Sequence, residues 1–175
     1  MSERSRLERD MIILRRAIVL QQSRKSNRPI LVILVGLPGS GKSYFAARFI
    51  NQIPATILES DFIRKTLLKK PTYSRHEHAR VFRAIYAVAK ELLDAKFNVI
   101  IDATNLNEKY RRPLHRIAEE IGANAVTVYL KTPRDVARER LIDRKLRGAS
   151  ISDADWSVYE MLEADFEPVR EPFYE

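Results

Sequence analysis

The 175-residue sequence contains no cysteine and no apolar run as long as a membrane span. Without thiols the chain can form no disulfide and no thiolate-ligated metal site. A membrane-spanning helix needs about 20 consecutive apolar residues. The apolar segment Met11–Leu20 is interrupted by Arg15 and Arg16 and no small-residue cleavage site follows, so it does not indicate a signal peptide. We expect one soluble, cytoplasmic unit that is long enough to bury a core and that does not engage a membrane.

Glycine is scarce, with five residues in all, yet three of them lie between positions 36 and 41. The stretch Gly-Leu-Pro-Gly-Ser-Gly-Lys-Ser at 36–43 fits the phosphate-binding pattern G-x-x-x-x-G-K-[S/T] at every fixed position. The apolar, β-branched run Ile30–Val35 precedes it and predicts a strand buried on both faces. Residues 44–50 follow with apolar side chains at helical spacing. The strand, loop and helix that this pattern requires are therefore all predicted.

The chemistry of phosphate binding explains the residue types in this loop. Glycines let phosphate oxygens approach successive backbone N–H groups, and the helix that follows directs its partial positive charge at the anion. Lys42 is expected to reach the β and γ phosphates and Ser43 to ligate Mg²⁺. The alternative is a glycine-rich turn with a surface lysine. The candidate cofactor-binding residues are Gly36, Leu37, Pro38, Gly39, Ser40, Gly41, Lys42, Ser43 and Tyr44.

The rest of the chain alternates predicted strands and helices. Further strands are predicted at 55–59, 97–102 and 125–130, and helices at 61–70, 75–93, 107–121, 133–147 and 152–166. This alternation predicts an α/β fold with a parallel sheet flanked by helices and right-handed crossovers. No convincing fifth strand is found, because residues 150–175 have the pattern of a helix and an acidic tail.

The first 28 residues precede the first core strand and are interpreted as an appendage. Residues 3–22 predict an amphipathic helix with Leu7, Met11, Leu14 and Ile18 on one face, and 23–29 a polar linker. The helix can pack on the domain, pair with a second copy in a homodimer, or lie on an anionic surface. Packing or pairing is favoured, because a basic amphipathic helix is a weak membrane signal. Residues 29–175 form the predicted main domain, with a lid around 133–150.

Two carboxylates follow predicted strands at the edge of the sheet where such proteins place their sites. Asp102 ends the third strand and is expected to serve Mg²⁺. Asp61 follows the second strand and could accept the proton of an attacking hydroxyl, while Arg64, one turn later, could bind an anionic substrate. The alternative is that Asp61 only stabilises a helix N-terminus and Arg64 is ordinary surface. His76, His78 and His115 are too dispersed to indicate a metal site.

Basic side chains are concentrated on the predicted helix 133–147. Arg140 and Arg144 lie at i and i+4 on one face, as expected of a lid that covers a phosphoryl group and excludes water. A solvated helix with partners such as Glu139 and Asp143 is the alternative. The crowded arginines are Arg134, Arg138, Arg140, Arg144 and Arg147.

The net charge of +8 is unevenly distributed, with +5 in residues 1–28, +10 in 29–150 and −7 in 151–175. A basic body suits a polyanionic partner, either nucleotide phosphates or nucleic acid. A solvated basic surface around a phosphate site explains the same charge equally well.

Several of these motifs together resemble the polynucleotide-kinase and zeta-toxin branch of P-loop kinases, over about residues 30–150. They are the loop 36–43, Ser60-Asp61 with Arg64, Asp102-Ala103-Thr104-Asn105, and Thr132-Pro133 leading into Arg140 and Arg144. The resemblance implies a sheet of order 2-3-1-4-5, and ATP and Mg²⁺ held by Lys42 and Ser43. It implies that Asp61 is the base, that Arg64 contacts the substrate or transition state, and that Arg140 and Arg144 belong to the lid.

The sequence therefore predicts an ATP- and Mg²⁺-dependent kinase that transfers the γ-phosphoryl group to a hydroxyl acceptor, with Lys42, Asp61, Arg64, Arg140 and Arg144 as candidate catalytic residues. The acceptor can be a nucleic-acid 5′-hydroxyl or a small molecule. One alternative is a nucleotide-switched binding module with negligible phosphotransfer. A second alternative is a basic RNA-binding protein.

Overall fold

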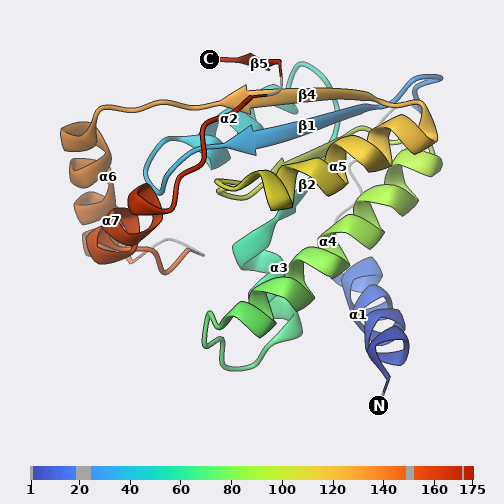
Figure 1. Ribbon diagram of the computed structural model, residues 1–175, viewed down its shortest axis with the longest axis horizontal. Helices are drawn as coiled ribbons and strands as arrows, with labels where there is room; N and C mark the ends of the chain where they lie inside the picture. Colours follow the sequence, from blue (N-terminus) through green and yellow to red (C-terminus); the bar gives the residue numbers. More distant parts are fainter. Residues whose placement is uncertain (1, 19–24, 149–151, 171) are drawn as a thin grey trace.

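The computed structural model describes residues 2–18, 25–148, 152–170 and 172–175. Its centre is a parallel sheet in the order β2-β3-β1-β4-β5 (Figure 1). The strands are β1 (Ile30–Val35), β2 (Thr56–Glu59), β3 (Val99–Asp102), β4 (Asn124–Tyr129) and β5 (Phe173–Tyr174). The predicted α/β class and parallel sheet are confirmed.

Helices cover both faces of the sheet (Figure 1). They are α1 (Glu3–Ala17), α2 (Lys42–Phe49), α3 (Ser60–Leu67), α4 (Arg75–Asp94), α5 (Glu108–Ile121), α6 (Arg134–Arg147) and α7 (Trp156–Ala164). In Figure 1, α4 and α5 lie in front of the sheet and α2 behind it, while α6 and α7 lie beyond the carboxyl ends of the strands. The helices that follow the strands therefore surround the edge where the predicted site residues lie.

The central strand β1 supplies both halves of the core. Leu31 and Ile33 belong to the larger apolar cluster, which includes side chains of α1, α4 and α5. Val32 and Leu34 face the opposite way and pack in a smaller cluster with side chains of α2. A strand between two neighbours with helices on both faces needs apolar residues throughout, which is why Ile30–Val35 shows no polar alternation.

The N-terminal helix packs on the domain. Met11 and Leu14 are buried in the larger cluster, and Asp10, only 1% exposed, accepts hydrogen bonds from Arg80 of α4 at 2.7 and 2.9 Å. The helix ends at Ala17, earlier than predicted, because Ile18 has extended backbone angles; residues 19–22 lie outside the described part. Its apolar face is thus occupied by its own domain, and pairing with a second copy stays a prediction.

None of the described helices is long and apolar enough to span a membrane. The longest of them, α4, carries charged side chains throughout its length.

A fifth strand exists, which corrects the expectation of a helix and acidic tail alone. Phe173 and Tyr174 pair with Thr127 and Val128 of β4 in parallel register. The ring of Phe173 also lies edge-on to that of Tyr129 at 5.9 Å. Two residues are too few to show a period in the sequence, so only pairing with β4 identifies the strand.

Two helix starts also differ from prediction. Helix α3 begins at Ser60, one residue before the predicted start at Asp61, and Glu59 has the extended backbone angles of a cap residue. The last helix begins at Trp156, where the carboxylate of Asp155 accepts a hydrogen bond from the Val158 N–H, and not after Ser152. Carboxylates and hydroxyls are almost equivalent caps, so the sequence alone cannot choose between neighbouring candidates.

Candidate active site

A cavity of about 630 Å³ lies at the carboxyl ends of the strands, between the glycine loop, α3 and the helices α6 and α7. It brings together most of the residues that the sequence singled out. Those that line it are Pro38, Gly39, Gly41, Lys42, Ser43, Tyr44, Asp61, Arg64, Asp102, Arg140 and Arg144.

The glycines of the loop are required by close packing and by backbone angles. A Cβ atom on Gly36 would lie 2.6 Å from Ser40 Oγ and 2.9 Å from the Leu130 carbonyl oxygen. Gly39 and Gly41 have φ angles of 80° and 96°, which favour glycine. A Cβ on Gly39 would also lie 2.9 Å from the carbonyl oxygen of Ala137 in α6. The loop can therefore fit closely under α6 only because Gly39 has no side chain.

Lys42 is the first residue of α2, so its side chain and the positive end of the helix dipole share the cavity. Its ammonium group donates to the Leu37 carbonyl oxygen at 2.9 Å and to Ser40 Oγ at 3.4 Å. Burial lowers the pKa of Lys42 to about 8, against the opposing influence of Asp102 and Asp61. An incoming phosphate would supply the negative charge that favours the protonated amine.

Ser43 and Asp102 meet on the floor of the cavity. The Asp102 carboxylate is only 4% exposed, and burial raises its pKa, while a hydrogen bond with Ser43 acts in the opposite direction. A hydroxyl and a carboxylate are oxygen ligands suited to Mg²⁺, which takes one or two from protein and the rest from phosphate and water. No group of three or more His, Cys, Asp or Glu side chains in the described ranges could hold a metal ion alone. The residues present therefore fit a nucleotide-bound Mg²⁺.

Glu59 is a residue that the sequence reasoning missed. It ends β2 directly opposite Asp102 of β3 and lines the same cavity as Asp61, two residues later in α3. Burial raises the pKa of Glu59 to about 7, and the negative charges of Asp102 and Asp61 act in the same direction. The rule that selected Asp102, a carboxylate at the carboxyl end of a strand, applies equally to Glu59.

Arg64 is not ordinary surface, because its residue is only 3% exposed and faces the cavity. Its Nη2 contacts His78 Nδ1 at 3.3 Å, and its guanidinium lies 4.7 Å from the centre of the Tyr73 ring. Its nearest carboxylate oxygen belongs to Glu77, at 3.9 Å. Its Nε and Nη1 have no hydrogen-bond partner among the described residues. A buried guanidinium with two such donors at a cavity wall is suited to an anion.

His78 holds the arginine in place and was also missed as a site residue. Its ring stacks on Phe82 at 4.5 Å and meets the Tyr110 ring edge-on at 4.7 Å. Burial lowers the pKa of His78 to about 4, and the charge of Arg64 acts in the same direction. The imidazole is therefore neutral near pH 7 and can accept a hydrogen bond from Arg64 through Nδ1. Its spacing from His76 gave no indication of this role.

The basic helix α6 directs two of its arginines at the cavity. Arg140 donates to the Gly39 carbonyl oxygen at 3.1 Å, and Arg144 donates to that of Ala154. The remaining arginines serve other contacts: Arg134 and Arg138 lie over Trp156 at 5.2 and 5.5 Å, and Arg147 pairs with Asp143. The i,i+4 pair that the sequence identified thus lines the cavity, and Arg140 contacts the glycine loop.

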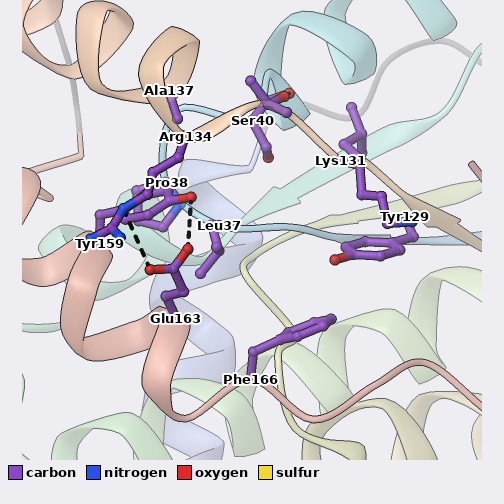
Figure 2. Close-up of a pocket in the computed structure, with 12 residues that line it drawn as sticks. Leu37, Pro38, Ser40, Tyr129, Lys131, Arg134, Ala137, Tyr159, Glu163 and Phe166 are labelled. Atoms are coloured by element: carbon purple, nitrogen blue, oxygen red, sulfur yellow. Dashed lines mark hydrogen bonds and ion pairs between the residues drawn. The ribbon is translucent and has the colours of Figure 1, made fainter.

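Leu37 and Ser40 line a separate cavity of about 250 Å³ and not the larger one, whereas Pro38 lines both. Figure 2 shows this smaller cavity, in which Glu163 contacts both Arg134 and Tyr159. The ring of Phe166 stacks on that of Tyr129 at 5.4 Å. Gly36 is buried and lines neither cavity, so its contribution to the site is the close packing of the loop.

The chain is similar in sequence to proteins that are named as kinases. The L-seryl-tRNA(Sec) kinase of Methanococcus maripaludis is 37% identical over 120 residues, which are 66% of this chain and 46% of that protein. The adenylyl-sulfate kinase of Myxococcus xanthus is 31% identical over 119 residues, which are 66% and 62% of the two chains. The chain thus spans about half of the first relative and less than two thirds of the second.

The chain is also similar in fold to a protein of known structure. The chain aligns with a protein in the structure of the Pnkp1/Rnl/Hen1 RNA repair complex at a TM-score of 0.65 and 26% identity, over 87% of this chain and 52% of that one. A sequence profile described as an AAA domain matches residues 31–169, which include the loop 36–43, Asp61, Asp102, Arg140 and Arg144. The chain therefore belongs to this AAA-domain family.

Proposed function

We propose that the protein is an ATP- and Mg²⁺-dependent kinase that transfers the γ-phosphoryl group to a hydroxyl acceptor. The observation that carries this proposal is the single cavity lined by the phosphate loop, by Asp61 and by the buried Arg64. A nucleotide switch needs only the first of these, whereas a phosphotransferase also needs a group for the acceptor hydroxyl and a place for the acceptor.

On the nucleotide side, the backbone N–H groups of the loop and the N-terminus of α2 bind the phosphates. Lys42, Arg140 and Arg144 neutralise charge on the transferring group, and the close fit of α6 against the loop excludes water from it. Ser43 and Asp102 would hold Mg²⁺, which supplies a Lewis acid for the β and γ phosphate oxygens.

On the acceptor side, Asp61 orients the hydroxyl and accepts its proton as the new oxygen–phosphorus bond forms. The bond between the γ-phosphorus and the β,γ-bridging oxygen breaks, and ADP leaves with the electron pair. Asp61 lies in the first turn of α3, so the same helix places the proton acceptor and, one turn later, Arg64 beside one cavity. This shared helix fixes the distance between the reacting hydroxyl and the group that Arg64 binds.

The names of the relatives suggest acceptors to test: a seryl-tRNA for one and adenylyl sulfate for the other. The basic body of the chain also supports a nucleic-acid 5′-hydroxyl. All three carry anions that the free donors of Arg64 could bind.

The test measures transfer of label from γ-labelled ATP in the presence of Mg²⁺ to seryl-tRNA, adenylyl sulfate and a 5′-hydroxyl oligonucleotide, each offered separately. We expect labelled product with one of the three, and about 10²-fold slower transfer by the Asp61→Asn variant, which should still bind ATP. Tight ATP binding with no transfer to these acceptors or to a mixed metabolite extract would contradict the kinase proposal.

A further inference from the structure

Residues 152–154, between α6 and α7, lie on the acceptor side of the cavity. Asp153, three residues before α7, accepts a hydrogen bond from Lys65 Nζ at 2.8 Å and another from the Tyr73 hydroxyl at 2.7 Å. Lys65 belongs to α3 and Tyr73 to the turn before α4, so neither is a sequence neighbour of Asp153. One carboxylate thereby connects the segment between α6 and α7 to α3 and to the turn before α4. Arg64 of α3 and Tyr73 of this turn line the cavity on the side proposed for the acceptor, which we call the acceptor wall.

The same wall contains unused donors. The Tyr73 ring lies 4.7 Å from the Arg64 guanidinium, whose Nε and Nη1 are buried without a hydrogen-bond partner in the described residues. Arg64 and Tyr73 line the cavity, and Asp153 links Tyr73 to Lys65. We call the three donors Arg64, Lys65 and Tyr73 the anion cluster. Tyr73 remains a donor at neutral pH, because burial and the hydrogen bond to Asp153 raise its pKa above the ordinary value. Among the described residues, only Asp153 accepts hydrogen bonds from side chains of the cluster through its carboxylate. Glu77 accepts one from the backbone N–H of Tyr73 at 2.8 Å and lies 3.9 Å from Arg64 Nη1.

We propose that Asp153 competes with the acceptor for the same donors. Its carboxylate accepts hydrogen bonds from Lys65 and Tyr73 until an anionic group of the acceptor replaces it. The inference rests on the proposed function, because it takes this wall as the acceptor site. It also narrows the acceptor to compounds that carry a phosphate or sulfate group in addition to the reacting hydroxyl.

The contacts of Asp153 are suited to exchange. The side chain of Lys65 is 37% exposed and that of Asp153 is 53% exposed. Ion pairs at such exposure add little to stability, so breaking this one is not costly. A dianionic sulfate or phosphate that also reaches the free donors of Arg64 makes more charge-assisted hydrogen bonds than Asp153 does, so the acceptor can displace it.

Displacement of Asp153 also acts on the phosphate side. The next residue, Ala154, accepts a hydrogen bond from Arg144 through its carbonyl oxygen. When the acceptor moves this segment, Arg144 loses that partner and becomes available to the phosphoryl group. Arrival of the acceptor thus frees a lid cation, which limits transfer of the phosphoryl group to water before the acceptor binds.

Binding of inorganic sulfate to protein saturated with ADP and Mg²⁺ tests the proposal, because ADP keeps sulfate out of the phosphate loop. The single tryptophan, Trp156, lies three residues after Asp153 and reports binding by its fluorescence at constant ionic strength. We expect Asp153→Asn to lower the sulfate Kd about fivefold, because sulfate then no longer has to break the exposed ion pair between Asp153 and Lys65. Lys65→Met should weaken sulfate binding in both backgrounds.

Asp165→Asn is the matched control, since it removes one exposed carboxylate at the other end of α7 and should leave the Kd unchanged. Equal sulfate affinity in Asp153→Asn and the natural protein would overturn the proposal. So would tighter binding that Lys65→Met does not reduce. The labelled-ATP assay separates the two proposals: transfer without an effect of Asp153 leaves the kinase intact, and a competed sulfate site without transfer leaves the anion cluster intact.

Discussion

The two sides of the cavity are built in different ways. The proposed phosphate side comes from consecutive residues, since the loop 36–43 supplies backbone donors, a lysine and a serine within a few residues of one strand end. The proposed acceptor side is assembled from α3, the turn before α4 and the segment before α7, through Arg64, Tyr73 and Asp153. A generic nucleotide can be bound by a local motif, whereas a particular acceptor is read by a surface that several segments share.

The largest effect is expected at the phosphate side. Lys42→Ala should lower kcat/KM by about 10³, because it removes a cation that contacts the nucleotide in the ground state and the transition state. ATP affinity should fall as well. Calorimetric titration with a non-hydrolysable ATP analogue, alongside steady-state kinetics, checks both effects. Undiminished turnover would show that the loop does not act as proposed.

Asp61 lies where the two sides meet, so its substitution should separate binding from turnover. Asp61→Asn should lower kcat by about 10² through loss of the proton acceptor, with ATP affinity near normal. Single-turnover transfer from labelled ATP measures the chemical step directly. Glu59→Gln is the control in the same cavity, and an equal loss in both variants would argue against a specific role for Asp61.

The acceptor side should respond alone when Arg64 is changed. Arg64→Lys should raise the acceptor KM about tenfold, because a point charge cannot replace the planar fork of donors, while ATP affinity stays unchanged. Steady-state kinetics at saturating ATP give the acceptor KM, and those at saturating acceptor give the ATP KM. Since Arg64 is buried, a thermal unfolding curve of the variant must show that it remains folded. A change in ATP affinity would contradict the division of the cavity.

The smallest effect is a pH dependence of stability from Glu59. Its pKa is raised to about 7 when folded, so between its ordinary pKa near 4.5 and pH 7 the folded protein binds the extra proton. Stability should therefore fall as pH rises through this range. Glu59→Gln should remove this slope and stabilise the protein at pH 8 by about 1 kcal/mol, after allowance for solvent screening. Denaturant unfolding from pH 5 to 8 measures it, and parallel profiles would contradict it.

The sequence predicted those parts of the site that depend on local pattern. The glycine loop, the carboxylates after the second and third strands, and the i,i+4 pair of Arg140 and Arg144 all lie at one cavity. Each was accessible because strand ends and helix faces follow from short-range periodicity. Glu59 could have been found by the same rule, since it ends a strand next to Asp61.

Other parts could not be predicted, because they depend on contacts between distant segments. The strand Phe173–Tyr174 forms only through pairing with β4. The buried position of Arg64 depends on contacts with the rings of His78 and Tyr73. Asp153 is 88 residues from Lys65, so nothing in its neighbourhood indicates that it lies beside the acceptor wall. Side-chain burial and partner choice are set by packing, which a single sequence does not display.

By itself, the sequence determined that this protein has a phosphate-binding loop at the end of a buried strand in a parallel α/β sheet. The backbone angles and close contacts of the loop require glycines at fixed positions in one short stretch of sequence. A strand covered on both faces requires an unbroken apolar run. Only the tertiary structure decided that Arg64 is buried with free donors and that Asp153 faces Lys65 and Tyr73. The physical reason is that charge interactions and hydrogen bonds depend on distance in space. Folding brings together residues that are far apart in the chain.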